Sequence, residues 1–112
     1  MQTINLEQFN KLSSFIEKSK LKKLIDDFFD PDTSGKNTLI SSLSKKDSEN
    51  IRKQAHYIKG SASFLGMQGI MEHCIFIETE IKENPHPNFE KLISDLQSVW
   101  ESSYLEAQNL VN

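Results

Sequence analysis

The stretch AHYIKGSASFLG, residues 55–66, decides how this chain is expected to fold. Read as a helix with 3.6 residues per turn, it divides into two faces. Apolar side chains recur at steps of three and four and form a seam typical of a core-facing helix. The seam consists of Ile51, Ala55, Ile58, Ala62 and Leu65. The opposite, outer face carries His56, Lys59, Gly60 and Ser63.

The composition indicates an ordinary globular protein. The chain has 112 residues, of which 37% are hydrophobic and 26% charged, so we expect one domain over residues 1–112. It has no apolar run of about 18 residues and no basic segment leading into an apolar stretch, which predicts neither a membrane span nor a secretory signal. The single cysteine, Cys74, cannot form an internal disulfide, and this favours a cytoplasmic location.

The charge is unevenly distributed along the chain. The net charge of −3 argues against a nucleic-acid-binding protein. Residues 36–60 nevertheless contain six basic and two acidic side chains, a net +4, which leaves −7 for the remainder. A basic region around His56 favours an anionic ligand or an acidic protein partner. The alternative is that these are ordinary solvated lysines.

Two helices are expected in the first part of the chain. The first is capped by Asn5 and ends near Ser19, and the second begins near Lys20. The Pro- and Gly-containing turn at residues 30–35 predicts a break or sharp kink, after which helix resumes through Leu43. The side chains expected to face inward are Leu6, Phe9, Leu12, Phe15, Ile16, Leu21, Leu24, Ile25, Phe28 and Phe29.

Three longer amphipathic helices follow. The first is capped by Asp47 or Ser48 and ends at Leu65 before Gly66. The second covers residues 68–83, and the third begins after a cap at Asn88. Their seams are Ile70, Cys74, Ile77 and Ile81, then Phe89, Leu92, Leu96 and Val99. The pattern predicts an all-α fold, an antiparallel four-helix bundle with an additional N-terminal helix packing at one end.

His56 has the surroundings of a phosphate-carrying nucleophile. Neutral imidazole is nucleophilic near pH 7. Lys59, one turn later on the same face, can neutralise a phosphoryl group on the ring. Gly60 costs a helix interior about 0.5–1 kcal/mol relative to Ala, and access for a second molecule would explain its presence. Tight helix packing is the alternative, although Gly60 lies off the seam.

The same residues resemble a known family. The run His56-Tyr57-Ile58-Lys59-Gly60-Ser61, followed by Leu65-Gly66, is similar to the signature of histidine-containing phosphotransfer (HPt) domains, with Ile58 in place of the commoner Leu. The similarity extends to the Leu-Ile-x-x-Phe-Phe and Cys-x-x-x-Glu segments around it. Glu78 stands where some relatives have Gln near the histidine ring. A ring-orienting hydrogen bond therefore does not follow from the resemblance.

The resemblance implies a phosphorelay intermediate. His56 would accept a phosphoryl group from a receiver aspartate or a kinase, expected to be a hybrid histidine kinase, and pass it to another response-regulator receiver. The chain would need no cofactor or metal of its own, because Mg²⁺ is expected in the partner receiver. We expect a monomer that offers a reactive side chain and a docking face but no complete active site, and hence not an enzyme.

The docking face is expected to include exposed groups near His56. The candidates are Lys53, Tyr57, Ser63 and Phe64, with Phe76 on the outer side of the next helix as a further one. Tyr57 and Phe64 could instead pack against neighbouring helices.

The sequence supports other functions and other sites less strongly. A helical module that binds and inhibits a kinase or receiver without carrying phosphate is the alternative function. Glu83-x-x-His86 contains Pro85, which prevents the helical geometry of a di-iron site, so no metal is expected. Cys74 is expected to be a buried apolar residue rather than a redox thiol, and His73 and His86 to be surface residues.

Overall fold

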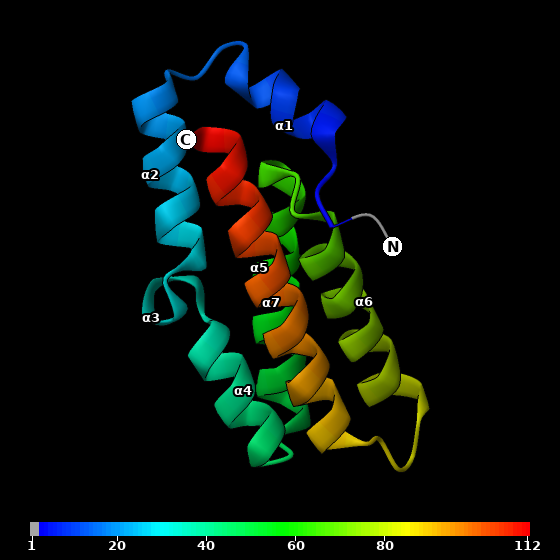
Figure 1. Ribbon diagram of the computed structural model, residues 1–112. Helices are drawn as coiled ribbons and strands as arrows, with labels where there is room; N and C mark the ends of the chain where they lie inside the picture. The colour runs from blue at the N-terminus through cyan, green and yellow to red at the C-terminus, as the bar shows by residue number, and fades with distance from the viewer. Residues whose placement is uncertain (1–2) are drawn as a thin grey trace.

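The structure is a computed structural model that describes residues 3–112. Over that range it contains helices and no strand, which confirms the all-α prediction. The helices are α1 (Leu6–Ser13), α2 (Lys18–Phe29), α3 (Pro31–Ser34), α4 (Lys36–Ser44), α5 (Ser48–Leu65), α6 (Gln68–Glu83) and α7 (Phe89–Val111) (Figure 1).

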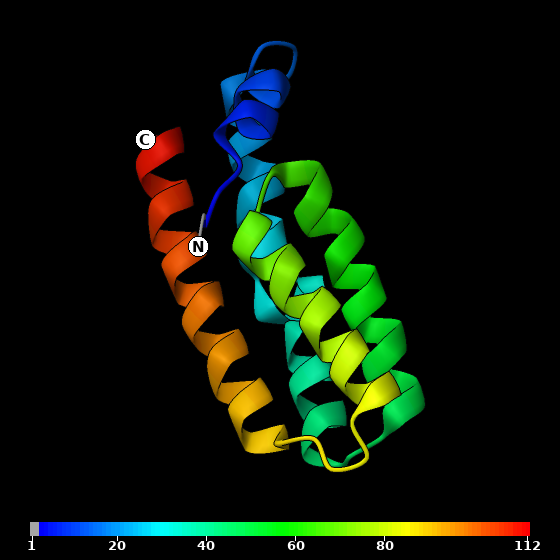
Figure 2. The same ribbon diagram turned by 90° about the vertical axis from the view of Figure 1, so that its right-hand side faces the viewer.

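The helices form a bundle in which α2 and α4 together make one of the four members. Helix α5 packs against α4 and α6, and α7 closes the bundle by packing against α6, α2 and α4. Helix α1 lies across the end where α5 turns into α6 (Figures 1 and 2). The predicted four-helix bundle with an extra N-terminal helix at one end is therefore confirmed.

Helix α5 has the bounds and the buried face that its sequence predicts. The Asp47 side chain accepts a hydrogen bond from the backbone N–H of Asn50 at 3.3 Å and caps the helix. Gly66 ends it in the left-handed conformation with φ of 80°. All five seam residues are at most 4% exposed. The outer face of α5 is consequently left to solvent.

The chain is broken, not merely kinked, between α2 and α4. Asp30 adopts an extended conformation, as expected before a proline, and its carboxylate accepts a hydrogen bond from Asp32 N–H at 2.9 Å. Pro31 opens the short α3, and Gly35 ends it with φ of 91°. Two local caps therefore replace the continuous helix.

The predicted end of the first helix is wrong. Helix α1 stops at Ser13, where the hydroxyls of Ser13 and Ser14 donate to the carbonyls of Asn10 and Lys11 at 3.0 and 2.7 Å. Such side-chain bonds compete with the helical pattern. Helix α2 then begins at Lys18, slightly before the predicted start.

Three side chains assigned to the interior are instead accessible. Phe15, in the loop after α1, is 68% exposed, and Leu6 and Leu24 are about half exposed. The other inward assignments in this part of the chain are buried or partly buried. The early end of α1 explains Phe15, because the helical seam no longer sets its direction.

Aromatic side chains join α2 to α7. The Trp100 ring stacks on Phe28 with centroids 5.1 Å apart and meets Phe29 edge-on at 5.7 Å. Its indole N–H donates to the Phe29 carbonyl at 3.3 Å. Trp100 is 4% exposed and therefore belongs to the core, although it is not among the predicted seam residues.

Candidate functional site

His56 lies on the outer face of α5. Its side chain is 74% exposed, whereas Ala55, one residue before it, and Ile58, two residues after it, are fully buried. The seam therefore fixes the direction of the histidine: because the core holds its neighbours, the imidazole must point outward. A second protein can reach this ring.

A carboxylate from α6 lies beside the histidine. Glu78 Oε2 is 3.9 Å from His56 Nδ1, longer than a hydrogen bond. Glu78 Oε1 is 3.0 Å from Lys59 Nζ. The Lys59 and Glu78 side chains are only 29% and 26% exposed. Lys59 is thus near His56 as predicted, but it is paired with Glu78 and more than two-thirds covered.

Gly60 leaves open space on the outer face. A Cβ atom built at this position would meet nothing within 4 Å, so no neighbouring helix approaches it. Tight intramolecular packing does not explain this glycine. The space beside the histidine is available to an approaching molecule.

The predicted docking residues fall on two sides of α5. Tyr57 and Phe64 are 58% and 52% exposed, so neither is packed inward. With Gly60 they line a groove between α5 and α2 that also includes Leu24 and Phe28. Phe76, on α6, is half exposed as well.

The second side is a hollow that contains the histidine. It is lined by Ser48, Glu49, Arg52, Lys53, His56 and Glu78. Lys53 is exposed and lies 3.8 Å from Glu49, while Ser63 is exposed near the other end of the helix. Gly60 and the two aromatic side chains do not line this hollow.

Arg52 was not singled out from the sequence as a site residue, and Glu78 was placed near the histidine ring only through the family resemblance. Arg52 precedes His56 by four residues and so shares its face, a signal that the spacing contains. Glu78 comes from another helix, and its contact depends on how α6 is aligned with α5. No pattern within α5 could have revealed it.

Cys74 is buried next to this charged cluster. Burial, and secondarily the charge of Glu78, raise the pKa of its thiol from 9.0 to about 12, while Lys59 acts in the opposite direction. The thiolate is the reactive form of cysteine. Cys74 is therefore an apolar core residue, as predicted.

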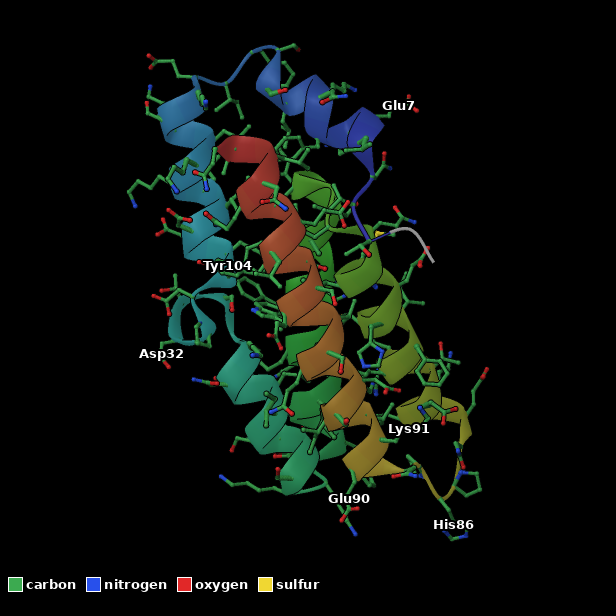
Figure 3. The ribbon with its side chains drawn as sticks, viewed as in Figure 1. Glu7, Asp32, His86, Glu90, Lys91 and Tyr104 are labelled. Atoms are coloured by element: carbon green, nitrogen blue, oxygen red, sulfur yellow. The ribbon has the colours of Figure 1, made fainter. Side chains whose placement is uncertain are left out.

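The two other histidines differ from each other. His73 was predicted to lie on the surface, but it is partly buried, with Nε2 3.1 Å from the Leu92 carbonyl and its ring stacked on Phe76. The prediction for His73 is wrong because α7 covers that face of α6. His86 is exposed and projects from the loop between α6 and α7 (Figure 3).

Metal-binding clusters and membrane-spanning helices are both absent from the described part of the chain. Residues 3–112 contain no group of three His, Cys, Asp or Glu side chains placed to hold a metal ion. None of the helices over that range is both long and apolar enough to cross a bilayer.

Comparison with known proteins identifies the class. The family model described as Hpt domain matches residues 23–108, most of the chain, and this chain therefore belongs to the Hpt domain family. No curated protein and no solved structure matches it. The protein is a phosphotransfer module of two-component signalling, a class that acts with receiver domains and kinases and carries phosphoryl groups rather than catalysing a reaction of its own.

Proposed function

We propose that the protein is a histidine phosphotransfer protein of a phosphorelay and that His56 is the residue that is phosphorylated. The observation that carries this proposal is the 74% exposed imidazole of His56 in the middle of α5, beside a glycine with open space around it. An imidazole on a rigid helix can enter the active site of another protein.

The transfer needs little from this chain beyond a nucleophile and its placement. A ring nitrogen of neutral His56 donates its lone pair to the phosphorus of an aspartyl phosphate. The new N–P bond forms as the P–O bond breaks, and the electron pair leaves on the aspartate carboxylate. Phosphoryl transfer depends mainly on positioning and charge neutralisation. Mg²⁺ of the partner receiver supplies most of the neutralisation, and this chain needs no cofactor of its own.

The surrounding residues take supporting roles in the proposal. Lys59 contributes positive charge near the phosphoryl group, and Gly60 allows the partner backbone to approach. Lys53, Tyr57, Ser63 and Phe64 form the docking face, whose apolar part is the groove between α5 and α2. The partners are response-regulator receivers and a hybrid histidine kinase. The protein itself acts as a monomer in the cytoplasm.

The direct test is transfer of labelled phosphate from a phosphorylated receiver domain. The wild-type protein and a His86→Gln control, altered at an exposed histidine far from α5, should take up label. His56→Gln should take up none. Label on the His56→Gln variant would contradict the site, and receiver binding by the wild-type protein without any label would favour the inhibitory interaction module instead.

A further inference from the structure

We propose that Glu78 shortens the lifetime of phosphorylated His56 and favours passage of the phosphoryl group to the next acceptor. This inference rests on the proposed function of His56. Glu78 does not touch the reacting atoms; it acts through its two neighbours, Lys59 and the imidazole ring.

The first step concerns Lys59. Its ammonium group lies 3.0 Å from Glu78 Oε1, and both side chains are more than two-thirds covered. Removing one member of a partly buried ion pair leaves the other charge uncompensated, which is unfavourable. Lys59 is therefore shared between Glu78 and the phosphoryl group, and it neutralises the phosphoryl group less than a lysine without a carboxylate partner would.

The second step concerns the two ring nitrogens. Nδ1 is the His56 nitrogen nearest Glu78, at 3.9 Å, so Nε2 lies farther from the carboxylate. Attack through Nε2 forms the N–P bond while the proton stays on Nδ1, and the phosphorylated ring then carries a positive charge. A carboxylate at this distance stabilises that charge.

The protonated ring is the form from which the phosphoryl group departs most easily. When the N–P bond breaks, the electron pair returns to Nε2 and the leaving group is neutral imidazole, whereas an unprotonated ring would leave as an anion. Transfer to an aspartate, or to water, regenerates the starting ring. Reduced neutralisation by Lys59 and a better leaving group both shorten the lifetime of phosphorylated His56.

The location of the carboxylate strengthens the inference. Glu78 Oε1 is inaccessible to solvent and forms an ion pair with the Lys59 ammonium. Glu78 also lines the hollow that contains His56, Arg52 and Lys53. It is the one charged side chain that α6 contributes to this hollow, whose other charged residues, Glu49, Arg52 and Lys53, lie on α5, so its removal changes the charge on the α6 side of His56.

The test measures the lifetime of the phosphorylated protein. Wild type and Glu78→Gln are phosphorylated with phosphoramidate, a small donor that needs no receiver, and loss of the phosphoryl group is followed by intact-protein mass spectrometry after the donor is removed. We expect the half-life of Glu78→Gln to be about two- to fivefold longer, the range that charge interactions at a partly exposed site support. Transfer to a receiver should be slower by a similar factor.

Three variants make the result specific. Glu83→Gln makes the same change of charge at an exposed position of α6 and should match wild type. Glu78→Asp keeps the charge and should stay closer to wild type than Glu78→Gln does, which also covers the case that Gln disturbs the fold. Lys59→Ala should shorten the half-life.

The possible failures are distinguishable. Equal half-lives for wild type and Glu78→Gln, with both labelled on His56, would overturn the role of Glu78 and leave the proposed function standing. A longer half-life in the Glu83→Gln control would also overturn it, because general charge would then be the cause. Absence of label on wild-type His56 from both phosphoramidate and a receiver would overturn the proposed function itself.

Discussion

At the scale of single residues, Gly60 is where stability and the proposed function make opposite demands. A Cβ at this position meets no atom within 4 Å, so Gly60→Ala should stabilise the free protein by about 0.5–1 kcal/mol through helix propensity alone. The same methyl group would stand where a receiver approaches, and transfer from a receiver should be slower. Urea unfolding and receiver-dependent labelling measure the two effects.

A small donor provides the control for Gly60. Phosphoramidate needs no docking, so Gly60→Ala should react with it as fast as wild type does. A comparable slowing with both donors would show that the methyl group disturbs His56 itself. Gly69→Ala is the structural contrast, because its Cβ would lie 2.9 Å from Val99 Cγ2, and we expect it to be destabilising.

Burial of Cys74 should make the protein less stable at alkaline pH. Its pKa is raised to about 12 in the folded protein from an ordinary 9.0, so above pH 9 the unfolded chain loses the proton first. Folding stability from this group is complete below pH 9 and declines between pH 9 and 12, by up to about 1.4 kcal/mol per pH unit. Urea unfolding followed by fluorescence of Trp100, the only tryptophan, measures the decline.

The matched comparison for this pH effect is Cys74→Ala. Lysines and tyrosines also titrate in that range, so the quantity of interest is the difference between wild type and variant. The free energy of unfolding of the variant should fall less steeply above pH 9. Parallel profiles would contradict the assignment of this effect to the thiol.

At the scale of the elements, the N-terminal segment is held to the turn between α5 and α6. The Asn5 N–H donates to the Gly66 carbonyl at 2.7 Å, and the Gly69 N–H donates to the Thr3 carbonyl at 3.0 Å. The Gln8 side chain adds a bond to the Phe64 carbonyl at 2.8 Å. Helix α1, which precedes the matched residues 23–108, is thereby fixed to the element that carries His56.

Gly66→Ala tests this connection. The φ of 80° disfavours a side chain, and its Cβ would lie 3.0 Å from the Asn5 carbonyl oxygen and 3.3 Å from Phe9 N. We expect a loss of at least about 1 kcal/mol in unfolding free energy. Phosphorylation of the folded fraction by phosphoramidate should be unchanged, since His56 lies well away from this turn. A variant as stable as wild type would contradict the close packing.

The sequence predicted elements where local signals agreed with packing. Helix α5 has a cap, a seam and a terminal glycine that all define the same bounds, and the structure has those bounds. The predicted end of α1 was wrong because the hydroxyls of Ser13 and Ser14 donate hydrogen bonds to backbone carbonyls. The spacing of apolar residues gives no information about such bonds. Phe15 was consequently placed in the core although it is exposed.

The candidate site was predictable only as far as one helix extends. The outward direction of His56 and the space at Gly60 follow from the α5 seam. The pairing of Lys59 with Glu78 follows from the contact between α5 and α6, and His73 is covered by α7 for a similar reason. Contacts between helices depend on their relative rotation and offset, which no single helical pattern specifies.

At the scale of the whole molecule, charge is separated over an acidic protein. Residues 36–60 carry a net +4 within a total of −3, and Arg52 and Lys53 lie in the hollow with His56. Opposite charges speed association, and salt screens them. We expect the rate of association with a receiver to fall as ionic strength rises, measured by stopped-flow fluorescence.

Replacement of basic residues should weaken this salt dependence selectively. Arg52→Ala with Lys53→Ala should lower the association rate at low salt and flatten its dependence on ionic strength. Lys18→Ala with Lys20→Ala, at exposed positions of α2, is the control with the same change in total charge. Equal effects of the two pairs would contradict a local electrostatic role.

The position of His56 in the interior of the 18-residue helix α5 has a consequence for the order of events. A rigid helix cannot move its imidazole from one partner to another. Under the proposed function, the protein that donates the phosphoryl group and the protein that accepts it must therefore bind at the same place, one after the other. Each transfer then requires one partner to dissociate before the next can bind. An abundant receiver that stays bound without reacting would block both donation and acceptance of the phosphoryl group. The relative concentrations of the partners would then set the rate of transfer.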